Sequence, residues 1–305
     1  MRAAIIGSTK IALIHYRSVI KKGYDEVYFI SRNIKKAELF IKKNKLNNKI
    51  AKPGNIRLIN NKKFQLISIC ANTEYHHEYL NYIKKTNSLI IVEKPIVSIK
   101  KLKKNYKNFL DNIYLKFPNL IVCYPMIMLA KKYLLHSKSR KQIKNIKVYY
   151  KTGGKHTFKY IMQDLLPHAL SLISIIIKKN DFVKGIKKIV SKSNKKSWSA
   201  RIEYEKIQLE FKFIQDENLK KSHFYFKINE TKIMRPTKII KDTFINYLSI
   251  KNKMIKISNP MDDFLKKSLR IKKNKSWMDF NKKLTYSNME LNFLLNNSVM
   301  YRNIK

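Results

Sequence analysis

The sequence is poor in several features, and each scarcity excludes a class of protein. Only two cysteines occur in 305 residues, Cys70 and Cys123, and both lie in apolar, strand-like runs. This indicates two buried thiols in a reducing compartment, without a disulfide framework. No apolar run reaches the roughly 18 residues that a membrane span requires. The first residues lack a basic region and a cleavage site, so we expect no signal peptide and a cytoplasmic protein.

Acidic residues are also scarce, with 20 Asp and Glu against 66 Lys and Arg, a formal net charge of +46. Such an excess is typical of proteins that bind nucleic acid or an anionic membrane surface. However, lysine is spread through every predicted helix and loop, as AT-rich coding DNA would produce, and no zinc-finger spacing or RNA-binding aromatic motif accompanies it. We therefore favour the compositional explanation and expect neither nucleic acid nor membrane as a partner. The charge would still favour small anions such as dinucleotide phosphates.

The first part of the chain alternates short apolar runs with helical patterns. Strands are expected at 3–6, 26–30, 56–58, 65–70, 89–92 and 120–124, and helices at 11–22, 37–45, 74–85 and 98–112. The strand-like runs are rich in β-branched residues and lack polar alternation, as in a parallel sheet that is covered on both faces. Residues 1–120 are therefore predicted to form an NAD(P)-binding Rossmann domain, a doubly wound α/β structure.

The pattern changes after residue 120. Strand-like segments with period-two alternation follow at 143–152, 187–193, 199–205, 206–214 and 223–228, separated by polar turns. This alternation favours an antiparallel sheet with one exposed face. Helices are expected from Pro167 to about Lys178, and over 287–302. Residues 121–305 are therefore predicted to form an α+β domain for substrate binding and oligomerisation, and an exposed sheet face would suit a homo-oligomer.

The loop between the first strand and the first helix has part of a dinucleotide-binding fingerprint. Such loops need a tight turn, a close approach of the backbone to the pyrophosphate, and a helix N-terminus that faces the phosphates. Gly7 satisfies the first need, and Ala12 permits close packing of helix on strand, but Thr9 replaces the second glycine. We expect Gly7, Thr9, Lys10 and Ile11 to contact the cofactor, although a structural turn would explain this loop about as well.

The end of the second strand bears on the choice between NAD and NADP. NAD-binding sheets carry an acidic residue there that bonds the ribose hydroxyls. Here the strand ends in Ser31 and Arg32. An arginine fork suits a 2′-phosphate, so NADP is slightly favoured over NAD. The alternative is that Arg32 is an ordinary surface arginine.

Three segments in order resemble the Gfo/Idh/MocA oxidoreductases, the group of glucose–fructose oxidoreductase and inositol dehydrogenase. The first is the loop at 7–15, in which His15 follows the last position of the fingerprint. The second runs from Ala71 to His76 and is similar to the family's Thr-Pro-Asn-x-x-His turn, with Asn72 in place of the proline. The third is Glu93-Lys94-Pro95 at the end of the next strand.

The resemblance implies roles for these segments. Ala71, Asn72, His76 and Glu93 are expected beside the cofactor, and Lys94 beside the nicotinamide and the reacting carbon. A buried ammonium group can polarise a carbinol or a carbonyl. By itself Glu93-Lys94 would more often be an exposed salt bridge. Its position at the carboxyl end of a buried parallel strand, where ligands bind, favours the functional interpretation.

The family's second motif is Asp-x-Gly-x-His, and Asp164 and His168 stand at the same spacing, with Leu166 in place of the glycine. Residues four apart lie on the same side of a helix, provided that the helix begins early enough. The resemblance implies that His168 is the general acid and base, and that Asp164 orients it or holds substrate. The alternative is a helix-start aspartate and a packed histidine.

These features predict hydride transfer between NAD(P) and a carbon of a sugar, a polyol or a nucleotide-sugar. Two alternatives stay open. The chain could be a non-catalytic dinucleotide- or nucleic-acid-binding protein on the same fold, as Thr9 and the net charge suggest. It could also be an imine reductase of the same family, although those members usually lack the lysine kept at position 94. Metal is not expected, because the adjacent His76 and His77 point to different faces of a helix.

Overall fold

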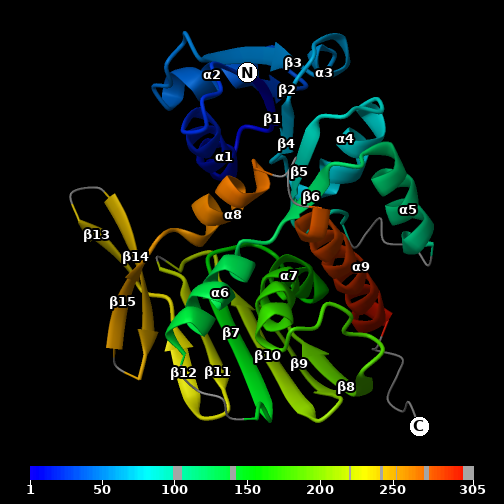
Figure 1. Cartoon of the computed structure of the whole chain (residues 1–305), viewed down its shortest axis with the longest axis vertical. Coiled ribbons are helices and arrows are strands. Elements are labelled where there is room, and N and C mark those ends of the chain that lie inside the picture. Colours follow the sequence, from blue (N-terminus) through cyan, green and yellow to red (C-terminus); the bar gives the residue numbers. More distant parts are fainter. Residues whose placement is uncertain are drawn as a thin grey trace. The chain divides into compact units, whose positions relative to one another are not determined.

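The computed structural model describes residues 1–98, 105–137, 142–219, 221–240, 243–251, 253–270 and 275–297. The predicted helices at 98–112 and 287–302 lie partly outside these residues. The chain forms two compact units, each shown in Figure 1. The first contains Met1–Tyr124 and Phe264–Thr285, and the second contains Pro125–Asp263 and Tyr286–Lys305. The first unit therefore includes a late segment that the predicted division at residue 120 assigned to the second domain.

A six-stranded parallel sheet forms the centre of the first unit. Its order is β3-β2-β1-β4-β5-β6, which confirms the predicted doubly wound topology. The central strands are buried because they consist almost wholly of apolar residues. The strands are β1 (Arg2–Ile6), β2 (Glu26–Ser31), β3 (Ala51–Asn55), β4 (Leu66–Ile69), β5 (Leu89–Glu93) and β6 (Leu120–Cys123). The connecting helices are α1 (Lys10–Ile20), α2 (Ile34–Lys43), α3 (Leu58–Asn61), η1 (Thr73–Tyr75), α4 (His76–Tyr82) and α5 (Tyr106–Lys116).

The strand predicted at 56–58 was wrong, because β3 precedes it and contains Pro53 and Gly54. Proline is tolerated in an edge strand, where its missing N–H costs no ladder hydrogen bond. At Gly54 a Cβ would lie 2.8 Å from the Cδ1 atom of Ile30, so the end of that side chain would have to shift. A strand made of such residues gives no apolar signal in the sequence.

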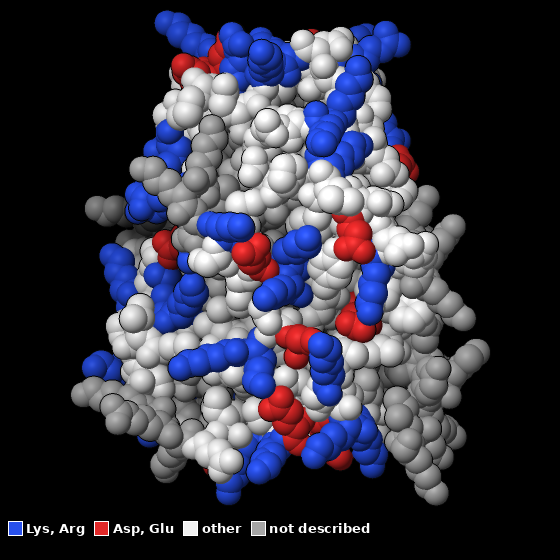
Figure 2. All heavy atoms as spheres, turned by 45° about the vertical axis from the view of Figure 1, so that its right-hand side comes forward, with Lys and Arg blue, Asp and Glu red and all other residues white. Residues whose placement is uncertain are grey.

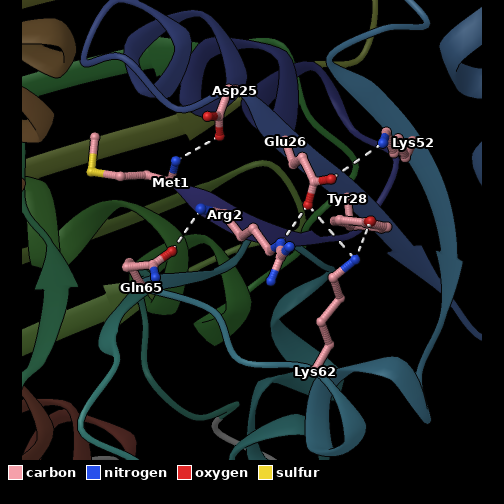
Figure 3. Close-up of polar contacts among 8 residues, drawn as sticks. All are labelled: Met1, Arg2, Asp25, Glu26, Tyr28, Lys52, Lys62 and Gln65. Carbon is pink, nitrogen blue, oxygen red and sulfur yellow. Dashed lines mark hydrogen bonds and ion pairs between the residues drawn. The ribbon is translucent and has the colours of Figure 1, made fainter.

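Charged and polar groups connect the strands at their amino ends (Figure 3). Arg2 and Glu26 are register partners on β1 and β2, and the Arg2 Nε atom donates to Glu26 over 2.5 Å. Glu26 also accepts from Lys52 on β3 over 3.3 Å. The backbone N–H of Arg2 donates to Gln65 over 2.6 Å. Cross-strand pairs of opposite charge favour this register of the sheet.

Residues from late in the chain complete the other edge of this sheet. Two helices, α8 (Pro260–Ser268) and α9 (Lys275–Asn297), contribute to the first unit. The Asn281 amide accepts from the Val122 N–H over 2.9 Å and donates to the Val122 carbonyl over 2.8 Å. Asn281 is fully buried. Its side chain thus occupies the hydrogen-bonding position that a further strand would take beside β6.

The second unit is built on a nine-stranded sheet of order β13-β14-β12-β11-β7-β10-β9-β8, with β15 paired to β14. Among the described strands of this second sheet, β7 and β10 pair in parallel, and the other pairs are antiparallel. The predicted mostly antiparallel α+β fold is therefore confirmed. Burial alternates along β9, as its sequence pattern predicts. The strands are β7 (Asn145–Thr152), β8 (Ile186–Ser193), β9 (Ser197–Tyr204), β10 (Ile207–Gln215), β11 (His223–Ile228), β12 (Thr231–Met234), β13 (Thr237–Ile240), β14 (Thr243–Ile250) and β15 (Lys253–Ile257).

Helices α6 (Met126–His136) and α7 (Lys159–Ile176) pack against each other, and α7 contacts β7, β9 and β10. The prediction that a helix begins at Pro167 was wrong, because Pro167 lies inside α7. A proline within a helix costs about 3 kcal/mol. The burial of Leu165, Leu166 and Leu170 around it offsets that cost. Tertiary packing has therefore overridden a local stop signal.

Lysine and arginine side chains are interspersed with acidic ones on the face that Figure 2 shows. Among the described residues, Lys147 and Arg201 both pair with Glu210. Among the described helices, none contains a stretch long and apolar enough to cross a membrane.

Replacement of Asn281 by alanine is expected to lower the free energy of unfolding by about 2–4 kcal/mol, since it leaves two buried backbone groups without partners. Chemical unfolding followed by circular dichroism measures this. Lys283→Ala, an exposed change on the same helix, is the control and should alter stability by no more than about 0.5 kcal/mol. Equal effects of the two substitutions would contradict the assigned role of Asn281.

Candidate functional site

The residues predicted to contact the cofactor lie at the carboxyl ends of four neighbouring strands. In open α/β sheets this is the edge at which ligands bind. The structure therefore brings together segments as far apart in the chain as Gly7 and Lys94, as the strand order shows. They are Gly7–Ile11 after β1, Ser31 and Arg32 at the end of β2, Ala71–His76 after β4, and Glu93 and Lys94 at the end of β5.

The loop after β1 retains one glycine of the fingerprint, and the backbone requires it. Gly7 has a φ of 113°, and a Cβ at this position would lie 2.8 Å from the Ala71 nitrogen. Thr9 is the N-cap of α1, and its hydroxyl accepts from the Ala12 N–H and donates to the Cys70 carbonyl. Thr9 thus satisfies one donor at the helix N-terminus. The N–H groups of Lys10 and Ile11 in the first turn have no carbonyl partner within the helix.

His76 connects the segments that follow β4 and β5. Its Nδ1 atom lies 2.8 Å from the Pro95 carbonyl oxygen, and its Nε2 atom lies 2.9 Å from the Ala71 carbonyl oxygen. The ring is buried, and burial lowers its pKa. A neutral imidazole has one N–H, so it donates to one of these carbonyls at a time. The contacts with backbone indicate that His76 positions the loops.

Glu93 turns inward from the end of β5 and meets His15 of α1. The His15 Nε2 atom lies 3.0 Å from a Glu93 carboxylate oxygen, and its Nδ1 atom shares a hydrogen bond of 2.6 Å with the Ser68 hydroxyl. The sulfur atoms of Cys70 and Cys123 lie beside this pair. These five residues form a buried polar cluster beneath the carboxyl edge, which we call the His15 cluster.

In the His15 cluster, His15 and Glu93 each stabilise the charged form of the other. Burial alone lowers the pKa of His15, but Cys70, Cys123 and Glu93 outweigh it and raise that pKa well above 6.5. Burial alone raises the pKa of Glu93, but the hydrogen bond and charge of His15, together with the charge of Lys94, lower it. Burial raises the pKa of Cys123, which keeps it a thiol. Both directions favour an ion pair between an imidazolium and a carboxylate.

Three side chains of this cluster, His15, Glu93 and Cys123, have possible ligand atoms within 4.8 Å of one another. Their hydrogen bonds account for this proximity, because both ring nitrogens of His15 are already engaged, by Ser68 and by Glu93. We therefore describe the cluster as an ion pair with hydrogen-bonded neighbours.

Arg32 lies at the surface after β2. Its guanidinium group is paired with Glu78 of α4, and it lies over the ring of Tyr75 at 4.5 Å from the centroid. The Arg32 and Glu78 side chains are 56% and 46% exposed, so the ion pair is weak and Arg32 is able to change partner. A negative charge nonetheless lies beside the arginine that was expected to bind a 2′-phosphate.

In the second unit, Asp164 and His168 lie one turn apart on α7, on the same side of the helix. The early start of α7 at Lys159 provides this geometry. Gln215, at the end of β10, donates from Nε2 to the Asp164 carboxylate over 2.7 Å and accepts from the His156 N–H over 3.0 Å. Gln215 thus fixes the Asp164 carboxylate to the loop that precedes α7.

His168 is half-buried, and its ring packs against that of Tyr150 on β7 with centroids 5.9 Å apart. Its Nδ1 atom is buried. The Ser171 hydroxyl donates to the His168 carbonyl oxygen over 3.0 Å. Ser171 therefore supports the helix backbone.

Several residues around these predicted sites were not predicted. They are Ser68, Cys70 and Cys123 around His15, Glu78 and Tyr75 around Arg32, and Gln215 beside Asp164. A polar serine in the middle of the apolar run that forms β4 was a usable signal for the first group. The contacts of Gln215 join segments about fifty positions apart, and no local pattern marks them.

Comparison with known proteins identifies the first unit. Residues 1–109 match a family model described as an oxidoreductase family with an NAD-binding Rossmann fold, GFO_IDH_MocA. Residues 1–109 thus correspond to the NAD-binding part of the Gfo/Idh/MocA family. This confirms the predicted family and the oxidoreductase class, with a nicotinamide dinucleotide as the class of cofactor. No curated protein matches the sequence.

Solved structures resemble the whole chain at low identity and thereby show its fold. A putative myo-inositol dehydrogenase from Sinorhizobium meliloti is 10% identical with a TM-score of 0.68, covering 100% of this chain and 99% of that one. A Gfo/Idh/MocA family oxidoreductase from Vibrio cholerae is 11% identical with a TM-score of 0.66, covering 98% and 99%. A 3-ketoreductase from Actinomadura kijaniata, in complex with TDP-benzene and NADP, is 11% identical with a TM-score of 0.64, covering 96% of each chain.

Substitution of Gly7 by alanine is expected to destabilise the protein and to abolish cofactor binding, because the new Cβ collides with the backbone of Cys70 and Ala71. Gly23→Ala is a matched control, since Gly23 also has a positive φ, of 81°, but its Cβ would meet nothing closer than 3.9 Å. The control should cost about 1–2 kcal/mol from backbone strain alone. Thermal unfolding and NADH fluorescence measure both effects. Similar losses in the two variants would contradict a specific role for the Gly7 contact.

Proposed function

We propose that the chain transfers a hydride between a nicotinamide dinucleotide and a carbon of a sugar, polyol or nucleotide-sugar. The observation that carries this proposal is the ordered carboxyl edge, in which the residues after β1, β2, β4 and β5 lie next to one another. The family match of the first unit supports the class of reaction. The similar 3-ketoreductase, crystallised with TDP-benzene and NADP, supports a nucleotide-sugar among the possible substrates.

The residues of the carboxyl edge suit a dinucleotide. The N-terminus of α1 offers N–H groups and a partial positive charge to a pyrophosphate, and Lys10 adds a full charge. We propose that Gly7, Thr9, Lys10 and Ile11 hold the phosphates. The other proposed cofactor contacts are Ser31, Arg32, Ala71, Asn72, His76, Glu93 and Lys94. The bound cofactor supplies the carbon that accepts or donates the hydride.

The protein's own contributions to the reaction are proton movement and polarisation. We propose that Lys94 polarises the oxygen on the reacting carbon of the substrate. His168 exchanges the hydroxyl proton, and Nε2 is the atom proposed, because Nδ1 is buried. Asp164, held by Gln215, orients the substrate or His168. A general acid or base contributes about 10²–10⁴-fold to such reactions.

Turnover with a panel of polyols, sugars and nucleotide-sugars, followed by NAD(P)H absorbance, tests these roles. His168→Ala is expected to lower kcat by about 10²–10⁴-fold, because the proton loses its carrier. Lys94→Ala is expected to lower kcat by about 10²–10³-fold, because a charge at the developing oxyanion is lost. Lys85→Ala removes an exposed lysine near Lys94 in the sequence and should leave turnover unchanged. Retained turnover in both site variants would show that the assignment is wrong.

The binding of NADPH and NADH separates this function from a non-catalytic one. Thr9, which caps α1 where the family has a glycine, is the observation that favours the alternative, since its side chain stands at the phosphate-facing helix end. An enzyme binds at least one of the two cofactors at micromolar concentration. If neither cofactor binds, and binding to DNA is salt-dependent, the chain is a non-catalytic binding protein.

The preference for NADP rests on Arg32, and Glu78 modulates it. Arg32→Ala is expected to weaken NADPH binding by about tenfold and to leave NADH binding nearly unchanged, since only NADPH carries the 2′-phosphate. Glu78→Gln removes the competing carboxylate and should strengthen NADPH binding. Fluorescence titration of both cofactors measures this. Equal affinities of the wild type for NADH and NADPH would refute the preference.

A further inference from the structure

Glu93 and Lys94 are neighbours in the sequence, but the Glu93 carboxylate is directed inward. Its residue is 7% exposed, and the carboxylate lies within the His15 cluster. A buried carboxylate is costly unless a charged group and hydrogen bonds compensate it. Whichever cation compensates Glu93 therefore controls how much of its negative charge acts on Lys94.

His15 is the group best placed to compensate Glu93. It is 1% exposed, its Nε2 atom lies 3.0 Å from the carboxylate, and it is held from the other side by Ser68 at 2.6 Å. His15 belongs to α1, whose first turn is the proposed phosphate site. The same helix therefore contacts both the proposed phosphate-binding loop and the carboxylate next to Lys94.

Other titratable groups surround the pair, among them His76, on which the charge of Glu93 also acts. Cys70, after β4, and Cys123, at the end of β6, lie close enough to influence its pKa, and Lys94 acts on Glu93 from the same strand end. Burial raises the pKa of Cys123 and keeps it a thiol, so Cys123 does not serve as a counter-ion. The Glu93 carboxylate, 3.0 Å from Nε2, is the acidic group that contacts the His15 ring directly.

We propose that His15 is a positioning residue, whose imidazolium neutralises Glu93 and so lessens the charge that this carboxylate exerts on the Lys94 ammonium. The Lys94 part of this inference rests on the proposed function. Without the imidazolium, the buried carboxylate would attract Lys94 or take up a proton. Either change alters the binding of cofactor beside Lys94.

The pH dependence of thermal unfolding, measured without any ligand, tests whether His15 is the counter-ion of Glu93. We call this the counter-ion part of the proposal. Because the pKa of His15 is raised on folding, its contribution to stability is full below the unfolded value of about 6.5 and is lost as the pH rises through the folded value. Because the pKa of Glu93 is lowered, its contribution is present above about 4.5 and is lost as the pH falls. The melting temperatures of wild type and His15→Gln should therefore differ most between about pH 5 and 7.

Two further variants make this readout specific. Glu93→Gln should remove the same pH-dependent component, and it serves if His15→Gln fails to fold. Ser68→Ala removes the other hydrogen bond of His15 but keeps both charges, so it should lower the melting temperature equally at all pH values. A difference between wild type and His15→Gln that does not change with pH would overturn the proposal.

The Lys94 part is tested by a double-mutant cycle, with NADPH and NADH as probes. His15→Gln is expected to weaken cofactor binding by about tenfold when Lys94 is present, and by less than about twofold in a Lys94→Ala background. The same loss in both backgrounds would mean that His15 acts only on the structure, and would overturn the positioning role. If the wild type binds neither cofactor, the proposed function and the Lys94 part fail together, and the unfolding profile alone decides the counter-ion part.

Discussion

The burial of one carboxylate, that of Glu93, determines the layout of the carboxyl edge in the first unit. Its partner cannot come from the adjacent strands, whose side chains here are serine and cysteine, so it comes from α1. The histidine that neutralises it belongs to the helix that starts at the proposed phosphate loop. Three elements that are distant in sequence, α1, β4 and β5, are thus connected by two hydrogen bonds of a single imidazole ring.

Of the loops next to this ion pair, the one after β1 keeps only one glycine of the dinucleotide-binding fingerprint. Gly7 remains because its φ of 113° and the contact with Ala71 exclude any side chain. The second glycine of the fingerprint has been replaced by Thr9, which caps α1 and bonds the loop after β4. The loop has therefore gained local hydrogen bonds at a position where the fingerprint leaves the backbone open to a ligand. His76 provides a comparable link between the loops after β4 and β5.

The parallel sheet was predictable because its central strands are continuous apolar runs, which only a doubly covered sheet explains. Strand β3 was not, because Pro53 and Gly54 conceal it, and α7 begins earlier than Pro167 suggested because apolar packing offsets the proline. For the candidate site, strand-end positions and spacing indicated the segments. The partners of these residues were not predictable, because His15 with Glu93 and Asp164 with Gln215 meet through the fold and share no local sequence pattern.

The double hydrogen bond of Asn281 to Val122 has a consequence for how the protein is made. During translation, β6 leaves the ribosome long before the residue that completes its edge, since 159 positions separate them. Domains commonly fold in order from the amino terminus as the chain emerges. Here the first unit waits for a segment that follows nearly the whole second unit. Until then, β6 exposes backbone groups that are free to pair with other chains, so we expect the nascent protein to depend on chaperones at this stage.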